Sequence, residues 1–200
     1  MLQNKGVGLD LKKKNSNNRI KNKKYIKKLL VIGVYKKSKG YIELLKIAEI
    51  LNKEKFKIDC YGYGDFQKLK LLKIKKKLKN ISFKKFDKNL NKKIKHYDLL
   101  LHLSKREGLP VSVMQCLRDG VPVICNKIRG NVDLIKNGSN GFFVNSYKDV
   151  PNLIYSLDSD NKKFNKIRKN AIKSITNEFS KKKINQMIYK IIKKNFIKKK

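Results

Sequence analysis

Two glycine-containing segments that follow predicted strands could suit a bound phosphate. The first runs from Gly33 to Gly40 and contains Lys39, whose ammonium group could lie beside a phosphate as a compact positive charge. The second is the pair Gly62-x-Gly64, a weak signal, because the same spacing is typical of any tight turn between a strand and a helix. The Gly33–Gly40 loop is therefore the stronger candidate for phosphate binding.

A third segment, Ser104 to Gln115, carries an acidic residue beside a predicted helix start. Glu107 lies between a predicted strand and a helix that Pro110 is expected to open. The N–H groups in the first turn of a helix form an anion site that contributes about 0.3–1 kcal/mol, or about 2 kcal/mol when partly buried. Glu107 would repel a phosphate, so it could instead accept hydrogen bonds from the hydroxyls of a sugar, or it could pair with Lys105 or Arg106.

Alternating strand and helix patterns predict the elements that would position these segments. The runs Leu29–Val34 and Tyr97–Leu103 are almost continuously apolar, which is typical of strands buried on both faces of a parallel sheet. The predicted strands are Leu29–Val34, Phe56–Tyr61, Asn80–Lys84, Tyr97–Leu103, Val121–Cys125 and Gly141–Val144. The predicted helices are Ser38–Lys53, Asp65–Lys79, Asn91–Lys95, Pro110–Asp119, Gly130–Lys136 and residues 148–158, 161–178 and 180–198. This alternation predicts an α/β fold, a single Rossmann-like, doubly wound parallel sheet with C-terminal helices.

The chain divides into three predicted parts. Residues 1–28 are polar and basic and form a hinge or linker, residues 29–178 form the α/β domain, and residues 179–200 form a basic amphipathic helix. The apolar stripe of that helix consists of Ile184, Met187, Ile188, Ile191 and Ile192. The pattern favours a terminal helix packed on the core. Its alternative is a helix in contact with an anionic membrane, where each nearby lysine contributes about 1 kcal/mol.

The strong positive charge invites a nucleic-acid interpretation that the pattern of the charges does not favour. The 52 Lys and Arg residues outnumber the 15 Asp and Glu residues, for a net charge of +37. Nearly all of them are lysines, spread along the chain without a known DNA- or RNA-binding motif. Lys, Asn and Ile share A/T-rich codons, so genome composition accounts for the excess. We expect no specific nucleic acid partner and keep a nucleic-acid-binding protein as an alternative.

The remaining composition indicates a globular protein in a reducing compartment. With 40% hydrophobic residues the chain can bury a core. Cys60, Cys116 and Cys125 lack metal-ligand spacing, so neither a disulfide scaffold nor a zinc site is expected. No apolar run approaches the roughly 18 residues of a membrane span, and the N-terminus lacks the apolar stretch of a signal peptide. We expect a cytoplasmic protein, with a peripheral position on the inner membrane face as the alternative.

Several motifs, taken in their order along the chain, resemble a known enzyme family. They are Lys5–Asp10, Glu107–Pro110, Met114-Gln115, Gly120–Ile124 and Gly130–Val144. Together they resemble the donor-binding half of retaining family 4 glycosyltransferases of the GT-B fold, in which the active site lies in a cleft between two domains. Lys5–Asp10 looks like the hinge between those domains, and the Gly33–Gly40 loop falls in the expected place.

The resemblance implies roles for named residues. Lys39 would hold the donor diphosphate and Glu107 would contact hydroxyls of the transferred sugar, so these two are the implied catalytic residues. Gln115 would lie near the ribose, and Lys85 and Phe86 near the base. The other implied donor contacts are Gly33, Gly108, Leu109, Pro110, Val111 and Ser112. The donor is a nucleotide-diphosphate sugar, positive groups would stabilise its departing diphosphate, and no cofactor or metal is implied.

The sequence departs from the family pattern at two positions and in extent. Gln115 stands where a second acidic residue is usual, and a neutral hydrogen bond (about 0.5–1.5 kcal/mol) is weaker than a charged one (about 1.5–3), so ribose binding should weaken about tenfold. Val34 stands where a phosphate-binding arginine is common, which removes another charge-assisted bond unless Lys36, Lys37 or Arg106 substitutes. The chain resembles only the donor half, so a separate N-terminal acceptor-binding domain would be its partner.

These observations lead to one expected function and three alternatives. We expect a glycosyltransferase donor domain that transfers a sugar with retained configuration, in the synthesis of cell-surface polysaccharide or glycolipid. The first alternative is a truncated, non-enzymatic remnant that binds a nucleotide sugar weakly or not at all. The others are a basic nucleic-acid-binding protein and a regulator that binds sugar phosphates.

Overall fold

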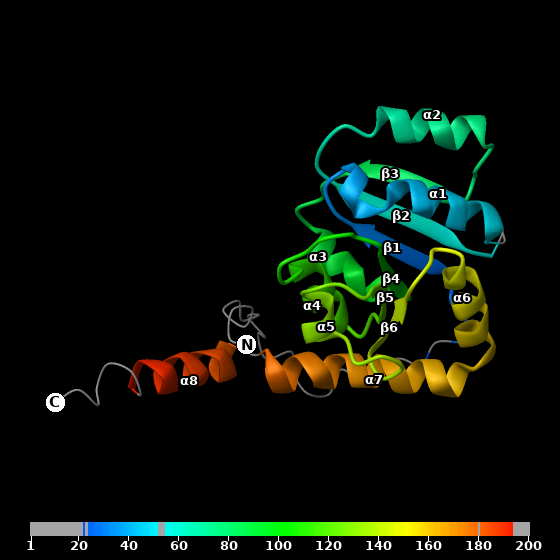
Figure 1. Ribbon diagram of the computed structural model, residues 1–200. Coiled ribbons are helices and arrows are strands. Elements are labelled where there is room, and N and C mark those ends of the chain that lie inside the picture. The colour runs from blue at the N-terminus through cyan, green and yellow to red at the C-terminus, as the bar shows by residue number, and fades with distance from the viewer. Residues whose placement is uncertain (1–21, 23, 52–54, 180, 194–200) are drawn as a thin grey trace.

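The computed structural model describes residues 22, 24–51, 55–179 and 181–193, which fold around one six-stranded sheet (Figure 1). The strands are β1 (Lys28–Ile32), β2 (Lys57–Gly62), β3 (Ile81–Lys85), β4 (Leu99–His102), β5 (Val123–Asn126) and β6 (Gly141–Val144). They lie in the order β3-β2-β1-β4-β5-β6, and each neighbouring pair is parallel. The order reverses between β1 and β4, as in a doubly wound Rossmann-like sheet, so the predicted fold class is confirmed.

Helices cover both faces of this sheet. They are α1 (Tyr41–Ile50), α2 (Gln67–Lys75), α3 (Leu90–Lys93), α4 (Val111–Arg118), α5 (Asn131–Leu134), α6 (Asp149–Ser159), α7 (Asn161–Glu178) and α8 (Lys181–Ile192), with 3-10 turns η1 (Lys37–Lys39) and η2 (Ile94–His96). α1, α2 and α6 pack on one face, and α3, α4 and α5 on the other (Figure 1). α7 joins the two cores, because Phe164 belongs to the first and Ile175 to the second.

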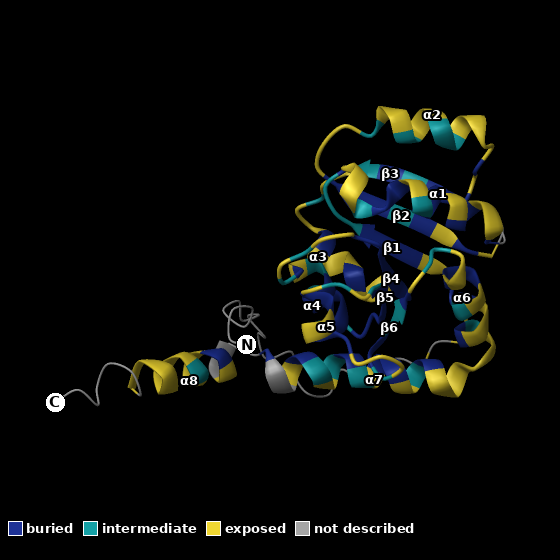
Figure 2. Cartoon of the chain, in the orientation of Figure 1, coloured by how far each residue is buried: buried dark blue, intermediate teal, exposed yellow. Residues whose placement is uncertain are grey.

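Side-chain alternation along the central strands explains why their sequences are almost continuously apolar. In β1, Leu29 and Val31 enter one core and Leu30 enters the other. β4 repeats the pattern, with Leu100 in the second core. The strands are therefore buried on both faces, and Figure 2 shows them largely in dark blue between the helices.

Two predicted helix starts need correction. The helix predicted over Ser38–Lys53, whose last two residues fall outside the described part, is interrupted at Gly40, where φ is +76°. A Cβ at position 40 would lie 2.6 Å from the carbonyl oxygen of Leu103, so glycine is required where these loops cross. α1 therefore begins only at Tyr41. Pro110, expected in the first turn of its helix, is instead the N-cap residue of α4, with an extended ψ of 108°.

The packed unit begins before Leu29, the boundary predicted for the domain. Ile26 is fully buried, and its N–H donates to the Asp158 carboxylate at 2.6 Å. The two N–H groups that follow donate to the buried carboxylate of Asp98 at 2.8 Å. Residues 26–28 are thus tied into the fold by buried polar contacts. Most of the predicted linker, residues 1–21 and 23, lies outside the described residues.

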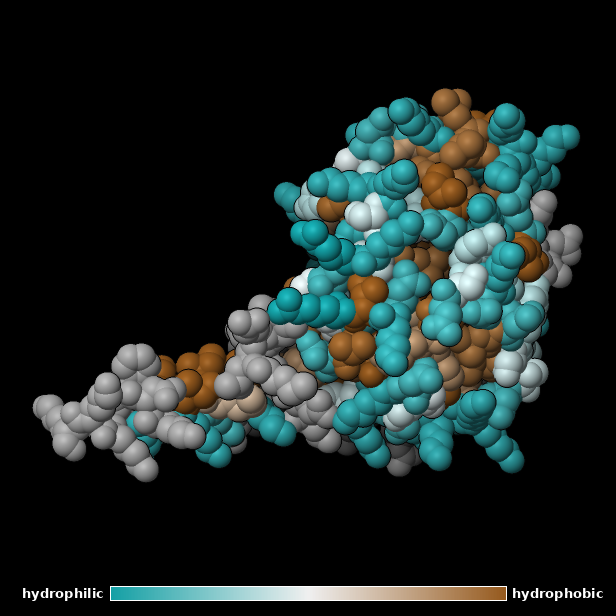
Figure 3. Space-filling view, viewed as in Figure 1, coloured by the Kyte–Doolittle hydropathy of each residue, from teal (hydrophilic) through white to brown (hydrophobic). Residues whose placement is uncertain are grey.

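The last helix packs on the body only at its start. Ile184 is 3% exposed, whereas Ile188, Ile191 and Ile192 are 36–45% exposed. Figure 3 shows apolar surface along the helix that extends from the body. Ile184, the first residue of the stripe, packs on the body, and contact of the helix with an anionic membrane stays a prediction. None of the described helices is both long and apolar enough to cross a membrane.

Candidate functional site

The loops that leave β1 and β2 meet closely at the carboxyl ends of the strands. A Cβ on Gly62, the last residue of β2, would lie 1.8 Å from the carbonyl oxygen of Gly33. The N–H of Gly33 donates in turn to the Tyr61 carbonyl at 3.0 Å. β1 and β4 are the strands between which the sheet order reverses, so their ends border the crevice where open α/β sheets bind ligands.

Lys39 and Glu107 come together in that crevice although 68 positions separate them in the chain. Nζ of Lys39 lies 2.5 Å from Oε1 of Glu107, and their side chains are only 24% and 15% exposed. Gly33 borders the pair, since a Cβ on it would lie 3.8 Å from Cδ of Lys39. The structure thus brings three of the predicted site residues together, and Glu107 pairs with Lys39 instead of Lys105 or Arg106.

A buried histidine adjoins this ion pair. His102, the last residue of β4, is 5% exposed, and its Nε2 lies 3.3 Å from Oε1 of Glu107 without forming a hydrogen bond to any of the described residues. Burial by itself would raise the pKa of the Glu107 carboxyl, but His102, Lys39 and Ser104 outweigh burial and lower the pKa to about 2. Glu107 is therefore an ionised carboxylate at neutral pH, able to accept hydrogen bonds and unable to donate them.

The loop after β5 supports the backbone that carries Glu107. Gly130 has a φ of +86°, and a Cβ on it would lie 1.7 Å from the carbonyl oxygen of Gly108. Nδ2 of Asn126 donates to the carbonyl oxygen of Ser104 at 3.2 Å. Asn131 is fully buried and donates from Nδ2 to the Asn126 carbonyl at 2.9 Å, while its Oδ1 has no partner among the described residues. Close backbone contact and the side-chain amides of Asn126 and Asn131 together fix the position of residues 104–108.

The start of α4 continues the site from Glu107. Ser112 and Gln115 are half-buried and lie about one turn apart, so both project from one side of the helix beside exposed Val111. As first-turn donors, the N–H groups of Val111 and Ser112 have no partners within the helix. Gly108 is exposed, and Leu109 is half-buried against the core. The predicted contacts from position 108 to 115 thus form one continuous stretch.

The residues expected near the base lie farther along the same edge of the sheet. Lys85 is the last residue of β3, and Phe86 follows it with 40% of its surface exposed. Phe86 stacks on Tyr63, which follows β2, with ring centroids 4.3 Å apart and planes inclined by 18°. Two of the predicted contacts therefore lie two strands away from β1, beyond the Lys39–Glu107 pair.

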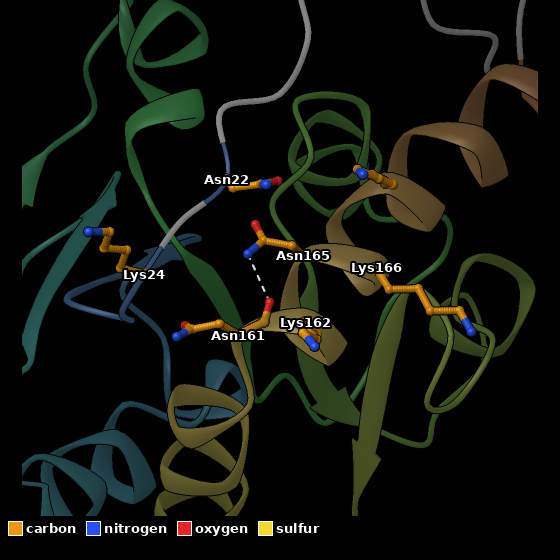
Figure 4. Close-up of a pocket in the computed structure, with 7 residues that line it drawn as sticks. Asn22, Lys24, Asn161, Lys162, Asn165 and Lys166 are labelled. Carbon is orange, nitrogen blue, oxygen red and sulfur yellow. Dashed lines mark hydrogen bonds between the residues drawn. The ribbon is translucent and has the colours of Figure 1, made fainter.

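A separate pocket of about 450 Å³ opens at the opposite end of the sheet, where the chain enters β1 and α7 begins (Figure 4). It is lined by Asn22, Lys24, Asn161, Lys162, Asn165, Lys166 and Lys169. Nδ2 of Asn165 donates to the Asn161 carbonyl at 2.8 Å, as the dashed line in Figure 4 marks, and the four lysines are exposed. This pocket contains none of the predicted site residues. We call it the α7 pocket.

The cysteines take no part in the site. All three are buried and free, and burial raises the pKa of each thiol, that of Cys125 to about 12, so reactive thiolates do not form. In the part of the chain that the structure describes, no group of three His, Cys, Asp or Glu side chains could hold a metal ion. That the chemistry needs no metal or cofactor rests on the family resemblance and stays a prediction.

Comparison with known proteins identifies the family. Residues 12–174 match the profile of the family described as glycosyl transferases group 1. The chain belongs to this family. The match includes all six strands and both Lys39 and Glu107, so the candidate site lies in the group 1 part of the chain.

Two curated group 1 relatives cover different shares of the chain. UDP-Gal:alpha-D-GlcNAc-diphosphoundecaprenol alpha-1,3-galactosyltransferase of Escherichia coli is 32% identical over 89 residues, which are 44% of this chain and 23% of that enzyme. Poly(glycerol-phosphate) alpha-glucosyltransferase of Bacillus subtilis is 28% identical over 153 residues, 73% of this chain and 23% of that enzyme. The aligned residues of the group 1 chain thus cover less than a quarter of the length of either relative.

Solved structures share the fold of this group 1 chain. Anabaena Alr3699/HepE in complex with UDP-glucose superposes with a TM-score of 0.77 at 20% identity, covering 84% of this chain and 49% of that one. The C-terminal domain of a glycosyl transferase group 1 family protein (LpcC) from Francisella tularensis gives 0.69 at 21% identity, covering 78% of this chain and 87% of that domain. The fold is that of the C-terminal domain of such a protein.

Sequence reasoning missed three polar residues that hold the group 1 site together. They are His102, Asn126 and Asn131. His102 and Asn126 each end a buried strand, and a polar residue at the carboxyl end of a parallel strand is the signal that could have found them. Asn131 opens a helix of only four residues and lies in the Gly130–Val144 motif of the family resemblance, which assigned it no role.

Proposed function

We propose that this chain is the donor-binding domain of a glycosyltransferase and takes a nucleotide-diphosphate sugar at the carboxyl edge of its sheet. The observation that carries the proposal is the contact between Lys39 and Glu107 at the strand ends where the sheet order reverses. A cation for the diphosphate and an ionised carboxylate for sugar hydroxyls therefore stand side by side, next to the start of α4. Membership of group 1 supports the reaction class.

Donor binding would exchange the partners of both side chains. The Lys39 ammonium would leave Oε1 of Glu107 for an oxygen of the diphosphate, and the carboxylate would accept hydrogen bonds from sugar hydroxyls. Each charge-assisted bond contributes about 1.5–3 kcal/mol, so two new bonds can offset the pair that is lost. The N–H groups of Val111 and Ser112 would meet a phosphate oxygen at the helix start.

In the proposed reaction the bond between the anomeric carbon and a diphosphate oxygen breaks, and the electron pair leaves with the nucleoside diphosphate. The oxygen of an acceptor hydroxyl forms the new bond to the same carbon, with retained configuration, and its proton passes to an oxygen of the departing diphosphate. Negative charge grows on the departing diphosphate, and Lys39 with the α4 N–H groups would stabilise that charge in a fixed arrangement. Groups of this kind typically contribute about 10²–10³-fold in rate each.

The finer parts of the proposal draw on the relatives. The Escherichia coli relative is named for UDP-Gal and a diphosphoundecaprenol-linked sugar, and the HepE structure holds UDP-glucose. By analogy we infer a role in cell-surface polysaccharide or glycolipid synthesis on the cytoplasmic side, with a separate acceptor-binding domain as partner. Val34 and Gln115, which lack the usual charges, permit the alternative of a remnant with weak or no donor binding.

Thermal unfolding in the presence of UDP, GDP and ADP tests the proposal. At least one nucleotide should raise the unfolding temperature saturably, since a ligand at 100 times its Kd stabilises by about 2.7 kcal/mol. Lys39→Ala should abolish the effect. Lys162→Ala, which removes an exposed lysine from the α7 pocket at the opposite end of the sheet, should keep it. Absence of any response at millimolar concentrations would favour the remnant.

A further inference from the structure

One polar atom beside the Lys39–Glu107 pair is buried without a hydrogen bond to any of the described residues. It is Nε2 of His102, a residue that is only 5% exposed. The atom lies 3.3 Å from Oε1 of Glu107, the same oxygen that Lys39 contacts. Burying a polar atom without a partner costs free energy, so its position at the ion pair calls for an explanation.

The sheet fixes the position of this imidazole. His102 ends β4 and pairs in register with Cys125 of β5. Because alternate residues of a strand share a face, its side chain lies on the same face as Leu100, where the second core and α4 cover the sheet. All four residues of β4 are buried, so packing holds the ring in place.

The backbone that carries Glu107 is also held, whereas the side chain of Lys39 can move. The N–H of Lys105 donates to the carbonyl oxygen of Ser38 at 2.8 Å, which ties the loop after β4 to the loop after β1. Lys39 has a flexible four-carbon stem, so its ammonium group can change partners by side-chain rotation alone. The lysine is therefore the part of this site that moves most easily when a ligand arrives.

Donor binding, as proposed above, takes the Lys39 ammonium away from Oε1 of Glu107. The Glu107 side chain is only 15% exposed, and a buried charge that loses its partner is strongly destabilised. Sugar hydroxyls can satisfy the carboxylate only if it is held where they arrive. Nε2 of His102 is in place to donate to the vacated oxygen when it carries the proton of the ring.

We propose that His102 is a positioning residue, whose Nε2–H donates to Oε1 of Glu107 when Lys39 turns to the donor diphosphate. The imidazole thereby holds the carboxylate for the sugar hydroxyls, and a neutral ring with its proton on Nε2 suffices for this role. The inference rests on the proposed function and adds a residue to which neither the sequence motifs nor the family resemblance gave a role. It separates two contributions, because His102 acts on the sugar part of the donor and Lys39 on the diphosphate.

Binding of nucleotides with and without a sugar tests the inference. The full chain is titrated with UDP, GDP and ADP, and with UDP-glucose, UDP-galactose, GDP-mannose and ADP-glucose. His102→Leu should weaken binding of the tightest nucleotide sugar about 10-fold, the loss of one hydrogen bond to a charged group, and leave binding of the matching nucleotide unchanged. His102→Gln keeps a donor on its side-chain amide and should restore most of the loss. His96→Leu removes an exposed histidine of η2 and is the matched control.

The imidazole nitrogens give an independent readout. The sequence contains only two histidines, so NMR spectra of the nitrogen-labelled chain show two rings, and His96→Leu assigns them. With the tightest nucleotide bound, His102 should carry its proton on Nε2, and that signal should shift relative to the free chain. The signals of exposed His96 should stay unchanged.

The outcomes distinguish the inference from the proposed function. If a nucleotide binds to the wild type but His102→Leu retains full affinity for the nucleotide sugar, the inference is overturned and the proposed function stands. The same holds if His102→Leu weakens nucleotide and nucleotide sugar equally, which is the mark of a merely structural role, or if bound nucleotide leaves the His102 signals unchanged. If neither nucleotides nor nucleotide sugars bind to the wild type, both are overturned.

Discussion

The Lys39–Glu107 pair and the α7 pocket both contain lysines, yet the two regions hold their lysines differently. In the pair, the two side chains are 24% and 15% exposed, touch at 2.5 Å and adjoin buried His102. In the α7 pocket the lysines are exposed, and Lys24 and Lys166 point away from each other (Figure 4). In the first region, burial and close backbone contacts fix the position of one lysine. The second region contains several lysines whose side chains have no common orientation.

The difference shows that backbone contacts distinguish a candidate site from a merely basic surface. Exposed charges are screened by water and salt, so a cluster of them attracts anions without selecting one. At the strand ends, Gly62, Gly130 and Gly40 let three loops approach within contact distance and fix where the charged side chains begin. In a chain of net charge +37, orientation is therefore more informative than charge.

The largest expected effect comes from breaking one of those backbone contacts. Gly130→Ala would put a Cβ 1.7 Å from the Gly108 carbonyl oxygen at a φ of +86°. The strain and the clash together should lower the free energy of unfolding by about 3–5 kcal/mol and displace Glu107. Chemical denaturation measures the first effect, and nucleotide binding at low temperature measures the second.

A second glycine separates the clash from the backbone strain. Gly138 has a similar φ of +75°, but nothing lies within 4 Å of a Cβ added there. Gly138→Ala should therefore lower the free energy of unfolding by only about 1–2 kcal/mol, the cost of a left-handed residue with a side chain. Nucleotide binding should be retained. If both variants lost the same free energy of unfolding, the contact between Gly130 and Gly108 would not be what holds the site.

The sheet could be predicted because the side chains of its central strands alternate between two faces that are both buried. All six predicted strands match observed strands within two residues at each end. The runs around Leu29–Ile32 and Leu99–Leu101 read as apolar without interruption, since both faces are covered. Helix ends were less accurate, because the left-handed Gly40 depends on a crossing with Leu103 that no local pattern encodes.

The site could be predicted only in part. The positions of Lys39 and Glu107 at strand ends followed from the alternation, but their direct contact spans 68 positions and depends on how the loops cross. The stack of Tyr63 on Phe86 follows from the register of β2 and β3, which the sequence does not state. Local patterns therefore indicated which loops carry the chemistry, and tertiary contacts decide which side chains meet.

A medium effect should appear in the pH dependence of stability. The fold lowers the pKa of Glu107 from 4.5 to about 2, so ionised Glu107 contributes stability that is present above pH 4.5 and is lost as the pH falls toward 2. At 1.36 kcal/mol per pKa unit, the contribution is at most about 3–4 kcal/mol. Glu107→Gln should flatten the decline of the free energy of unfolding between pH 4.5 and pH 2, as followed by urea denaturation.

The control for this titration removes a carboxylate from an ordinary surface pair. Glu49 contacts Lys76 at 2.7 Å, with the two side chains 38% and 37% exposed. Exposed pairs of this kind contribute about 0–1 kcal/mol, so Glu49→Gln should leave the decline nearly as steep as in the wild type. If Glu107→Gln and Glu49→Gln gave the same curve, the Lys39–Glu107 pair would be no more than another surface contact.

The smallest effect is expected from substitutions in the α7 pocket, which tests the region predicted to have no specific anion site. Reversing two charges there, with Lys162→Glu and Lys166→Glu, should change the free energy of unfolding by no more than about 0.5 kcal/mol, because exposed substitutions away from packed contacts seldom do more. Affinity for the nucleotide should also be unchanged, although the variant loses four units of charge. Long-range attraction is weakened by salt, so titrations at low and at physiological ionic strength separate general attraction from a specific contact. A loss of nucleotide affinity that persists at physiological ionic strength would place the anion site in the α7 pocket and not beside Lys39.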